Sequence, residues 1–124
     1  MITRLLIVGA GGALGAMARY ALSRWVADAF QRFPAGTLVV NVLGCFLIGV
    51  FMALVEEERF FSQNVRLFAT IGLFGGLTTF STFGHETVEL VRDQEKKLAL
   101  LSVALNVVLG IAAVLAGRAV AKLV

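Results

Sequence analysis

Long apolar segments, separated by short polar stretches, make up nearly all of the chain. They cover roughly residues 2–29, 37–55, 65–90 and 98–115. Each has about the 20 residues that an α-helix needs to cross the hydrocarbon core of a bilayer. Charged and turn-forming residues gather in the connections, at 31–36, 56–66 and 92–97. The pattern predicts an all-α membrane protein with four transmembrane helices, forming a single domain over residues 1–124.

The third segment differs from the others because polar and helix-weakening residues interrupt it at mid-span. Gly75 and Gly76 are adjacent, and each disfavours a helix by roughly 1 kcal/mol. Three threonines and a serine follow, with Phe80 and Phe83 among them. One interpretation is a flexible helix whose hydroxyls bond back to carbonyls four residues earlier. A helix broken in the membrane is tolerated only where protein buries it or where it lines a polar cavity, and its free backbone groups can bind ions. The density of hydroxyls and phenyl rings favours this second interpretation, a broken third helix with an ion site.

Other polar side chains also lie inside the apolar segments. Arg19 either reaches the membrane surface or lines an aqueous vestibule, where it would concentrate anions. Asn41 either bonds to another helix or presents its amide to an anion. Ser102, Asn106 and Gly110 recur every four residues, so they share one face of the fourth helix. A stripe of this kind indicates the lining of a polar pathway.

Composition narrows the class of protein further. Hydrophobic residues make up 59% of the chain and charged residues 15%, with a mean hydropathy of +0.90. Soluble domains are about 45–50% apolar, so these values require a lipid bilayer as the environment. The net charge is only +3, and no basic run is interleaved with aromatic residues, so we expect no nucleic-acid partner. No pairing of a nucleophile with a base is evident, which argues against an enzyme.

The basic residues do not fix an orientation in the membrane. Four spans put both termini and the second connection on one side, together with five of the basic residues, whereas the other side carries six. The positive-inside rule therefore sets no preferred topology. Such a chain can insert both ways, and two opposed copies can pair about a two-fold axis in the membrane plane.

Three motifs resemble those of the Fluc (CrcB-like) fluoride channel family, and the resemblance covers nearly the whole chain. They are Gly12-Ala-Leu-Gly15 with Arg19-Tyr20, Gly36-Thr-Leu-Val-Val-Asn41 with Gly44, and Gly72 through Phe83 followed by Glu86. The resemblance implies an antiparallel, dual-topology homodimer in the bacterial inner membrane. Each dimer would export fluoride through two pathways, one on each side of its axis.

The resemblance also implies roles for individual residues. Backbone carbonyls of Gly75 and Thr78 from both subunits would hold a structural Na+, and Arg19 and Glu86 would lie in a vestibule. The fluoride path would be lined by side chains from the second, third and fourth segments: Asn41, Phe80, Phe83, Ser81, Thr82, Thr37, Ser102 and Asn106. Fluoride holds its water tightly, so a pore must replace that water with hydrogen-bond donors. Phenyl rings have a positive edge that can contact an anion without binding it too tightly to leave.

Two other kinds of membrane protein compete with this interpretation. A proton-coupled small multidrug exporter of dual topology needs a carboxylate inside the membrane, and Glu86 is the only candidate in the sequence. A non-transporting assembly subunit would use its glycines for packing alone. That role leaves Asn41 and the hydroxyls of residues 79–82 unexplained at a cost in lipid.

Overall fold

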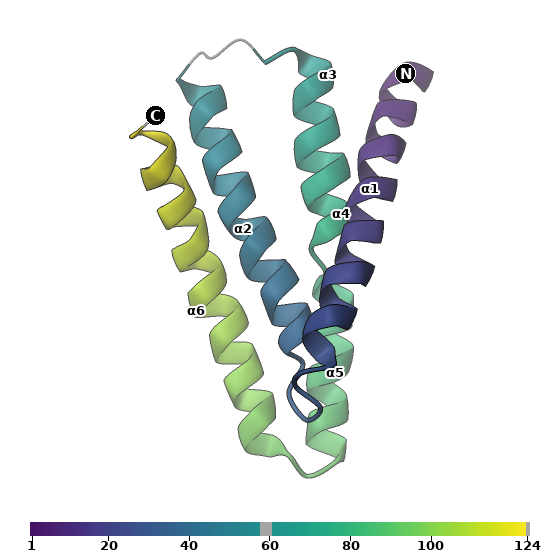
Figure 1. Cartoon of the computed structure of the whole chain (residues 1–124), viewed down its shortest axis with the longest axis vertical. Coiled ribbons are helices and arrows are strands. Elements are labelled where there is room, and N and C mark those ends of the chain that lie inside the picture. The colour runs from purple at the N-terminus through teal and green to yellow at the C-terminus, as the bar shows by residue number, and fades with distance from the viewer. Residues whose placement is uncertain (58–60, 124) are drawn as a thin grey trace.

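The structure is a computed structural model that describes residues 1–57 and 61–123, and it is helical nearly throughout. The elements are α1 (Ile2–Ala27), α2 (Ala35–Glu56), α3 (Gln63–Arg66), the π-helix η1 (Leu67–Phe74), α4 (Gly75–Leu77), α5 (Phe80–Arg92) and α6 (Lys96–Ala121). Elements α3 to α5 together form one span, and four spans are long and apolar enough to cross a membrane (Figure 1). The prediction of four transmembrane helices is confirmed.

The ends of the spans differ in places from those expected. The fourth helix continues to Ala121 rather than ending near residue 115, and α2 includes Glu56. These extensions meet, because Arg118 Nη2 lies 2.6 Å from Glu56 Oε2. The ion pair joins the C-terminal ends of α2 and α6, at the start of the charged connection expected over residues 56–66. Glu58 and Arg59 of that loop lie outside the described residues.

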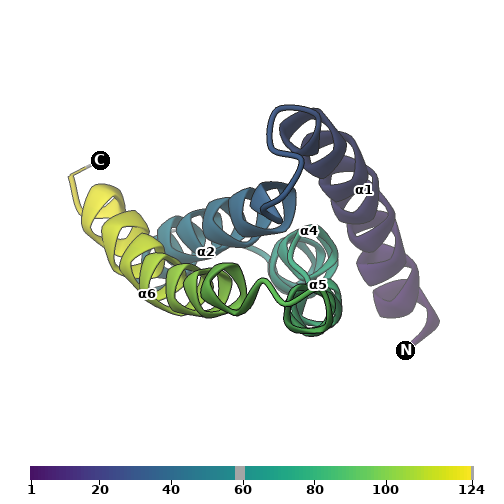
Figure 2. The same ribbon diagram turned by 90° about the horizontal axis from the view of Figure 1, so that it is seen from below.

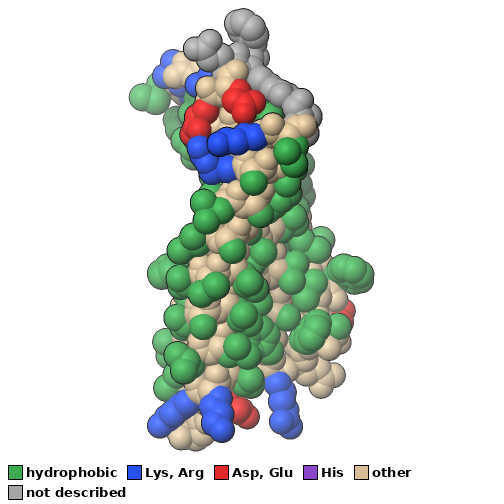
Figure 3. Space-filling model, turned by 90° about the vertical axis from the view of Figure 1, so that its left-hand side faces the viewer, with side chains coloured by type: hydrophobic (Ala, Val, Ile, Leu, Met, Phe, Trp, Pro, Cys, Tyr) green, Lys and Arg blue, Asp and Glu red, His purple; other side chains and the backbone are tan. Residues whose placement is uncertain are grey.

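The spans run alternately up and down. Both termini lie at one end of the molecule, together with the C-terminal end of α2 and the start of α3, and the other two connections lie at the opposite end (Figure 1). Hydrophobic side chains cover the middle of the face in Figure 3, and charged side chains gather at its two ends. This is the distribution expected for a protein that spans a bilayer.

Glycines bring α1 and the third span into direct backbone contact. Gly11 and Gly15 of α1 face Gly72 and Gly76, so two small-residue motifs with the same four-residue spacing pack against each other. A Cβ on Gly76 would lie 2.7 Å from the Gly12 carbonyl oxygen, which no real side chain tolerates. Small residues at this spacing let two helix backbones approach closely in lipid, and here the partner of α1 is the third span.

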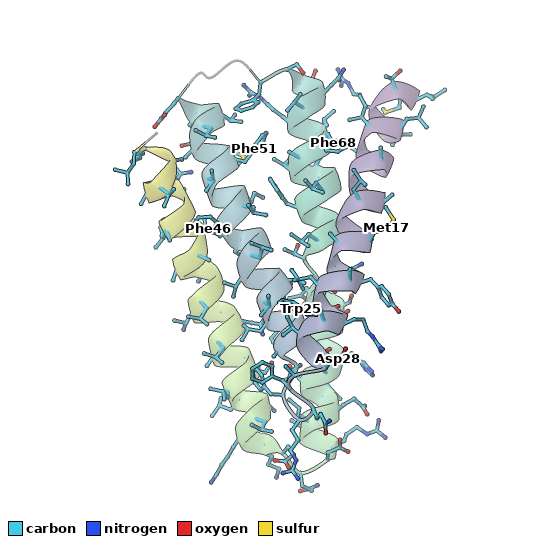
Figure 4. The ribbon with its side chains drawn as sticks, viewed as in Figure 1. Met17, Trp25, Asp28, Phe46, Phe51 and Phe68 are labelled. Atoms are coloured by element: carbon cyan, nitrogen blue, oxygen red, sulfur yellow. The ribbon has the colours of Figure 1, made fainter. Side chains whose placement is uncertain are left out.

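A second helix pair, α2 with α6, packs beside the first. Gly49 of α2 lies against the Val114 backbone, and Gly117 of α6 against the Phe46 backbone. Seen from below in Figure 2, the third span lies between α1 and this pair. Phe51 connects the two halves, since its ring centroid is 5.9 Å from that of Phe74. Figure 4 shows Phe51 on the side of α2 that faces the third span.

The third span is interrupted, but not at its paired glycines. Gly75 has helical angles, φ −64° and ψ −36°, and Gly76 is also helical. The helix is interrupted instead at Thr78 and Thr79, whose backbones are extended. Before the break, η1 is π-helical over Leu67–Phe74, a form that the sequence pattern had not indicated. The expectation of a broken third helix is correct, and the break lies between the paired glycines and Phe80.

Candidate ion site at the helix break

The side chain of Asn41 stabilises the break by forming hydrogen bonds with the backbone of Thr79. Its Oδ1 accepts the Thr79 amide at 2.8 Å, and its Nδ2 donates to the Thr79 carbonyl at 3.2 Å. One side-chain amide thus satisfies both backbone groups of an extended residue, much as a neighbouring strand would. Unpaired backbone groups are costly at this depth in a membrane, so this pairing allows the helix to stop there.

The Thr79 side chain then begins the next helix. Its Oγ1 accepts the Thr82 amide at 3.2 Å and donates to Thr82 Oγ1 at 3.0 Å. This is an N-cap, which satisfies one of the free amides in the first turn of α5. The positive end of the α5 dipole and the negative end of the preceding half-helix therefore meet at residues 78 and 79.

The same arrangement releases backbone carbonyls before the break. In a continuous α-helix the Thr79 amide would donate to the Gly75 carbonyl, but here it donates to Asn41. The Thr78 carbonyl accepts a long bond, 3.5 Å, from Arg19 Nη1. Gly44 of α2 makes room for the break, because a Cβ there would collide with Thr78 Cγ2. The Gly75 carbonyl therefore lacks its α-helical donor, and the family resemblance had implied this carbonyl and that of Thr78 as cation ligands.

A cavity of about 400 Å³ lies beside the break and brings together half of the predicted site residues. Its lining includes residues from three spans: Asn41, Gly44, Cys45, Thr70, Gly75, Thr78, Thr79, Phe80, Phe83 and Asn106. The two phenyl rings are neighbours, with centroids 5.6 Å apart and planes tilted by 58°. Phe80 is 83% exposed, so its ring projects away from the chain that carries it.

The polar stripe on α6 divides between the cavity and the protein interior. Asn106 lines the cavity, and its Oδ1 accepts a bond of 3.0 Å from Asn41 Nδ2. Asn106 Nδ2 donates to the Ser102 carbonyl at 2.9 Å. The Ser102 residue itself is only 1% exposed and is not part of the cavity lining. The Asn41–Asn106 contact joins the break to the fourth span.

A smaller cavity of about 210 Å³ lies on the other side of the break, between α1, α2 and α5. Arg19, predicted for a vestibule, lines it together with Thr37 and Thr82, which were predicted for the fluoride path. Thr37 is buried in the first turn of α2, which follows the N-cap residue Pro34. The Thr37 hydroxyl donates instead to Glu86 Oε1 at 2.9 Å.

Glu86 and Ser81 lie outside both of these cavities. Glu86 lines a third cavity of about 330 Å³ under the connection between α1 and α2. Its Oε2 is buried and has no hydrogen-bonding partner among residues 1–57 and 61–123. Ser81 is exposed on the first turn of α5, with its Oγ 3.4 Å from Thr79 Oγ1. The pathway residues predicted from the sequence thus occupy several neighbouring compartments.

The sequence pattern was not used to identify Thr79 as the N-cap of a helix or to assign Gly44 to the break. Thr79 directly precedes the amphipathic helix α5, and a threonine in that position is a recognised N-cap signal. The contact of Gly44 with Thr78 has no comparable signal, because it depends on how α2 and the third span cross.

Four apolar spans, a broken third helix and polar side chains gathered at the break define a multi-pass membrane transport protein. The family model described as CrcB-like protein, Camphor Resistance (CrcB), matches residues 6–118, and the chain belongs to this family.

Similar proteins match over most of their length. The chain is 48% identical over 120 residues to a "Fluoride-specific ion channel FluC" of Methanopyrus kandleri, covering 97% of this chain and 90% of that protein. It is 45% identical over 117 residues to the protein of that name from Geobacter sulfurreducens, covering 94% and 91%. It is 41% identical over 114 residues to "Fluoride-specific ion channel FluC 1" of Methanosarcina acetivorans, covering 92% and 87%. The family resemblance expected from the motifs is confirmed.

Proposed function

We propose that this protein is a fluoride-selective channel that lets fluoride leave the cell down its electrochemical gradient. Family membership and the names of the relatives support this function over that of an exporter, an assembly subunit or an enzyme. The observation that carries the proposal is the cavity at the break, where Phe80 and Phe83 lie beside the amides of Asn41 and Asn106. Ring edges and neutral donors offer a dehydrated anion several weak contacts and no opposite charge to trap it.

Charges around the break suggest how an anion is attracted and then passed on. Arg19 lines the vestibule cavity and raises the local anion concentration there. The first amides of α5 add the positive end of a helix dipole at the boundary between the two cavities. Beyond this point the contacts come from phenyl edges and amides, which carry no full charge. This order favours entry without tight binding.

A second copy of the chain, inserted in the opposite direction, would complete the site. Phe80 is 83% exposed and Gly75 is exposed in the single chain, although both line the cavity. An exposed phenyl ring beside exposed backbone carbonyls is what an interface between subunits would cover. The even split of basic residues supports opposed insertion, because neither orientation is favoured.

A structural Na+ on the axis of that dimer fits the groups at the break. The carbonyls of Gly75 and Thr78 are neutral, hard oxygen donors at the negative end of a half-helix, where transporters coordinate such cations. The Thr78 carbonyl has two lone pairs, so its bond to Arg19 leaves one for the ion. When bound, the ion would supply positive charge between two anion pathways.

Anion efflux from liposomes tests the channel function. The purified protein is reconstituted in vesicles loaded with fluoride or with chloride, and efflux is followed with an ion-selective electrode. We expect rapid efflux of fluoride and little efflux of chloride. Equal efflux of both anions, or efflux of fluoride no faster than from empty vesicles, would exclude the proposed function.

The sodium proposal has a test that does not depend on transport. The thermal unfolding midpoint of the purified protein is measured in sodium, potassium and choline chloride at the same ionic strength. A ligand that binds only the folded state raises its stability, so we expect the highest midpoint in sodium. The same midpoint in all three salts would contradict a bound Na+.

A further inference from the structure

Most polar side chains around the cavity have no hydrogen left to offer an anion. The hydroxyl of Thr70 donates to the Arg66 carbonyl at 2.7 Å, and that of Thr78 donates to the Phe74 carbonyl at 3.0 Å. Thr79 donates its single hydroxyl hydrogen to Thr82. A threonine hydroxyl has one donor hydrogen, so each of these cavity hydroxyls is already committed to the protein.

The Asn41 amide is committed in the same way. Its nitrogen carries two hydrogens, and the structure gives that nitrogen two acceptors, the Thr79 carbonyl and Asn106 Oδ1. Its oxygen accepts the Thr79 amide. Freeing an Asn41 hydrogen for an anion would break either the clamp on the helix break or the contact with α6.

Asn106 differs from Asn41 in one respect. Its nitrogen also carries two hydrogens, but only one acceptor, the Ser102 carbonyl, is found for it among the described residues. The remaining hydrogen belongs to a side chain that lines the cavity together with Phe80 and Phe83. The bond from Asn41 to Asn106 Oδ1 fixes which end of the amide is the donor. It also polarises the amide, because hydrogen bonds in a chain strengthen one another.

We infer that Asn106 is the side-chain amide that donates to fluoride, and that Asn41 is a positioning residue that shapes the break and orients Asn106. This inference rests on the proposed function and assigns the donor within it. The sequence alone had left Asn41 between two roles, interhelical contact and anion donor. Its bonds to Thr79 and Asn106 assign it the first role.

Selective isotope labelling can distinguish the two amides directly, because the chain contains only three asparagines: Asn41, Asn64 and Asn106. Protein labelled with ¹⁵N in asparagine alone gives three side-chain NH₂ signals in liposomes, assigned by replacing each residue in turn. Asn64 lies on α3, away from the cavity, and serves as the internal control. Fluoride and chloride are titrated in parallel.

We expect fluoride to cause its largest shift on one hydrogen of Asn106, a smaller shift on Asn41 and none on Asn64, and we expect chloride to have no such effect. A largest shift on Asn41, or fluoride efflux without any shift at Asn106, would overturn the assignment and leave the channel function standing. Absence of both shifts and efflux would overturn the channel function itself.

A pair of substitutions provides a second test of the donor. Asn106→Ser keeps a donor hydrogen, whereas Asn106→Val removes it. We expect Asn106→Val to lower fluoride efflux by about an order of magnitude, and Asn106→Ser to retain more of it. Equal efflux from the two variants would contradict the inference. The labelling experiment uses the natural sequence, so it decides the question even if Asn106→Val fails to fold.

Discussion

Single residues at the break each perform more than one task. Thr79 pairs its backbone with Asn41, caps α5 through its hydroxyl and lines both cavities next to the break. Its side chain is therefore the simplest place to separate helix capping from transport.

We expect Thr79→Ala to lower the free energy of unfolding by about 1–2 kcal/mol, because the α5 N-cap is lost. Thr87→Ala on the same helix is the matched control. The Thr87 hydroxyl only bonds back to the Phe83 carbonyl, at 2.8 Å, so its removal should change stability little. Both variants are compared by thermal unfolding of the purified protein. Equal loss in the two variants would contradict the capping role.

The phenyl rings offer a residue-scale test of the pathway. If Phe80 and Phe83 were only packing groups, Phe→Ile would cost roughly 1 kcal/mol of stability and leave transport intact in folded protein. If their edges contact fluoride, isoleucine removes the ring quadrupole and roughly keeps the volume. We expect Phe80→Ile and Phe83→Ile to fold normally and to lose most fluoride efflux. Normal efflux through both would exclude the lining role.

Much of the site could be predicted residue by residue, but its bonding could not. Polar residues inside apolar segments are costly in lipid, so Asn41, Thr79 and Asn106 were visible as unusual positions. Whether Asn41 bonds an anion or the protein depends on Thr79, which is 38 residues away in the chain. Sequence spacing carries no information about a contact of that kind between two helices.

At the scale of elements, the break shows why intrinsic propensity was a poor guide to its position. Gly75 and Gly76 weaken a helix, yet both are helical, and Gly76 is needed for its contact with the Gly12 backbone. The chain leaves the helix at Thr78, and the Asn41 side chain from α2 binds the backbone of the next residue, Thr79. A tertiary contact thus determines where the helix breaks, and the lowest helix propensity, at the paired glycines, lies about one turn earlier in the chain.

The contact between α1 and the third span leads to a prediction at the same scale. A Cβ on Gly15 would collide with the Leu73 carbonyl oxygen, whereas a Cβ on Gly9 meets no atom of the described residues within 4 Å. We expect Gly15→Ala to destabilise the fold by roughly 1–3 kcal/mol through overpacking. Gly9→Ala should be neutral or stabilising by up to about 1 kcal/mol, because alanine favours a helix. Thermal unfolding of the two variants decides between these outcomes, and equal midpoints would refute the close packing.

At the scale of the whole molecule, four spans and the side on which each terminus lies followed from hydropathy alone. Apolar length sets the number of crossings, and each crossing reverses the side. Dimerisation of two chains cannot be deduced from hydropathy. It depends on surface shape, and here the features that point to it are an exposed Phe80 ring and the exposed backbone at Gly75.

Gly75 provides a test of that partnership because it separates the fold of one chain from the contact between two. A Cβ at Gly75 meets no atom closer than Thr70 O at 3.6 Å, whereas a Cβ at the adjacent Gly76 would lie 2.7 Å from Gly12 O. We therefore expect Gly75→Val to leave the helical content of the subunit intact and to abolish dimers, since its side chain would enter the space between two copies. Gly76→Val should disrupt the subunit itself.

Helical content by circular dichroism and mass by light scattering in detergent distinguish these two effects. A Gly75→Val protein that remains dimeric and keeps its unfolding midpoint in sodium would rule out both the proposed interface and the proposed Na+ at that carbonyl. A monomeric, helical Gly75→Val protein whose midpoint no longer depends on sodium would connect the two. In the proposed site a single chain would supply only half of the carbonyl ligands, so the cation and the dimer should be lost together.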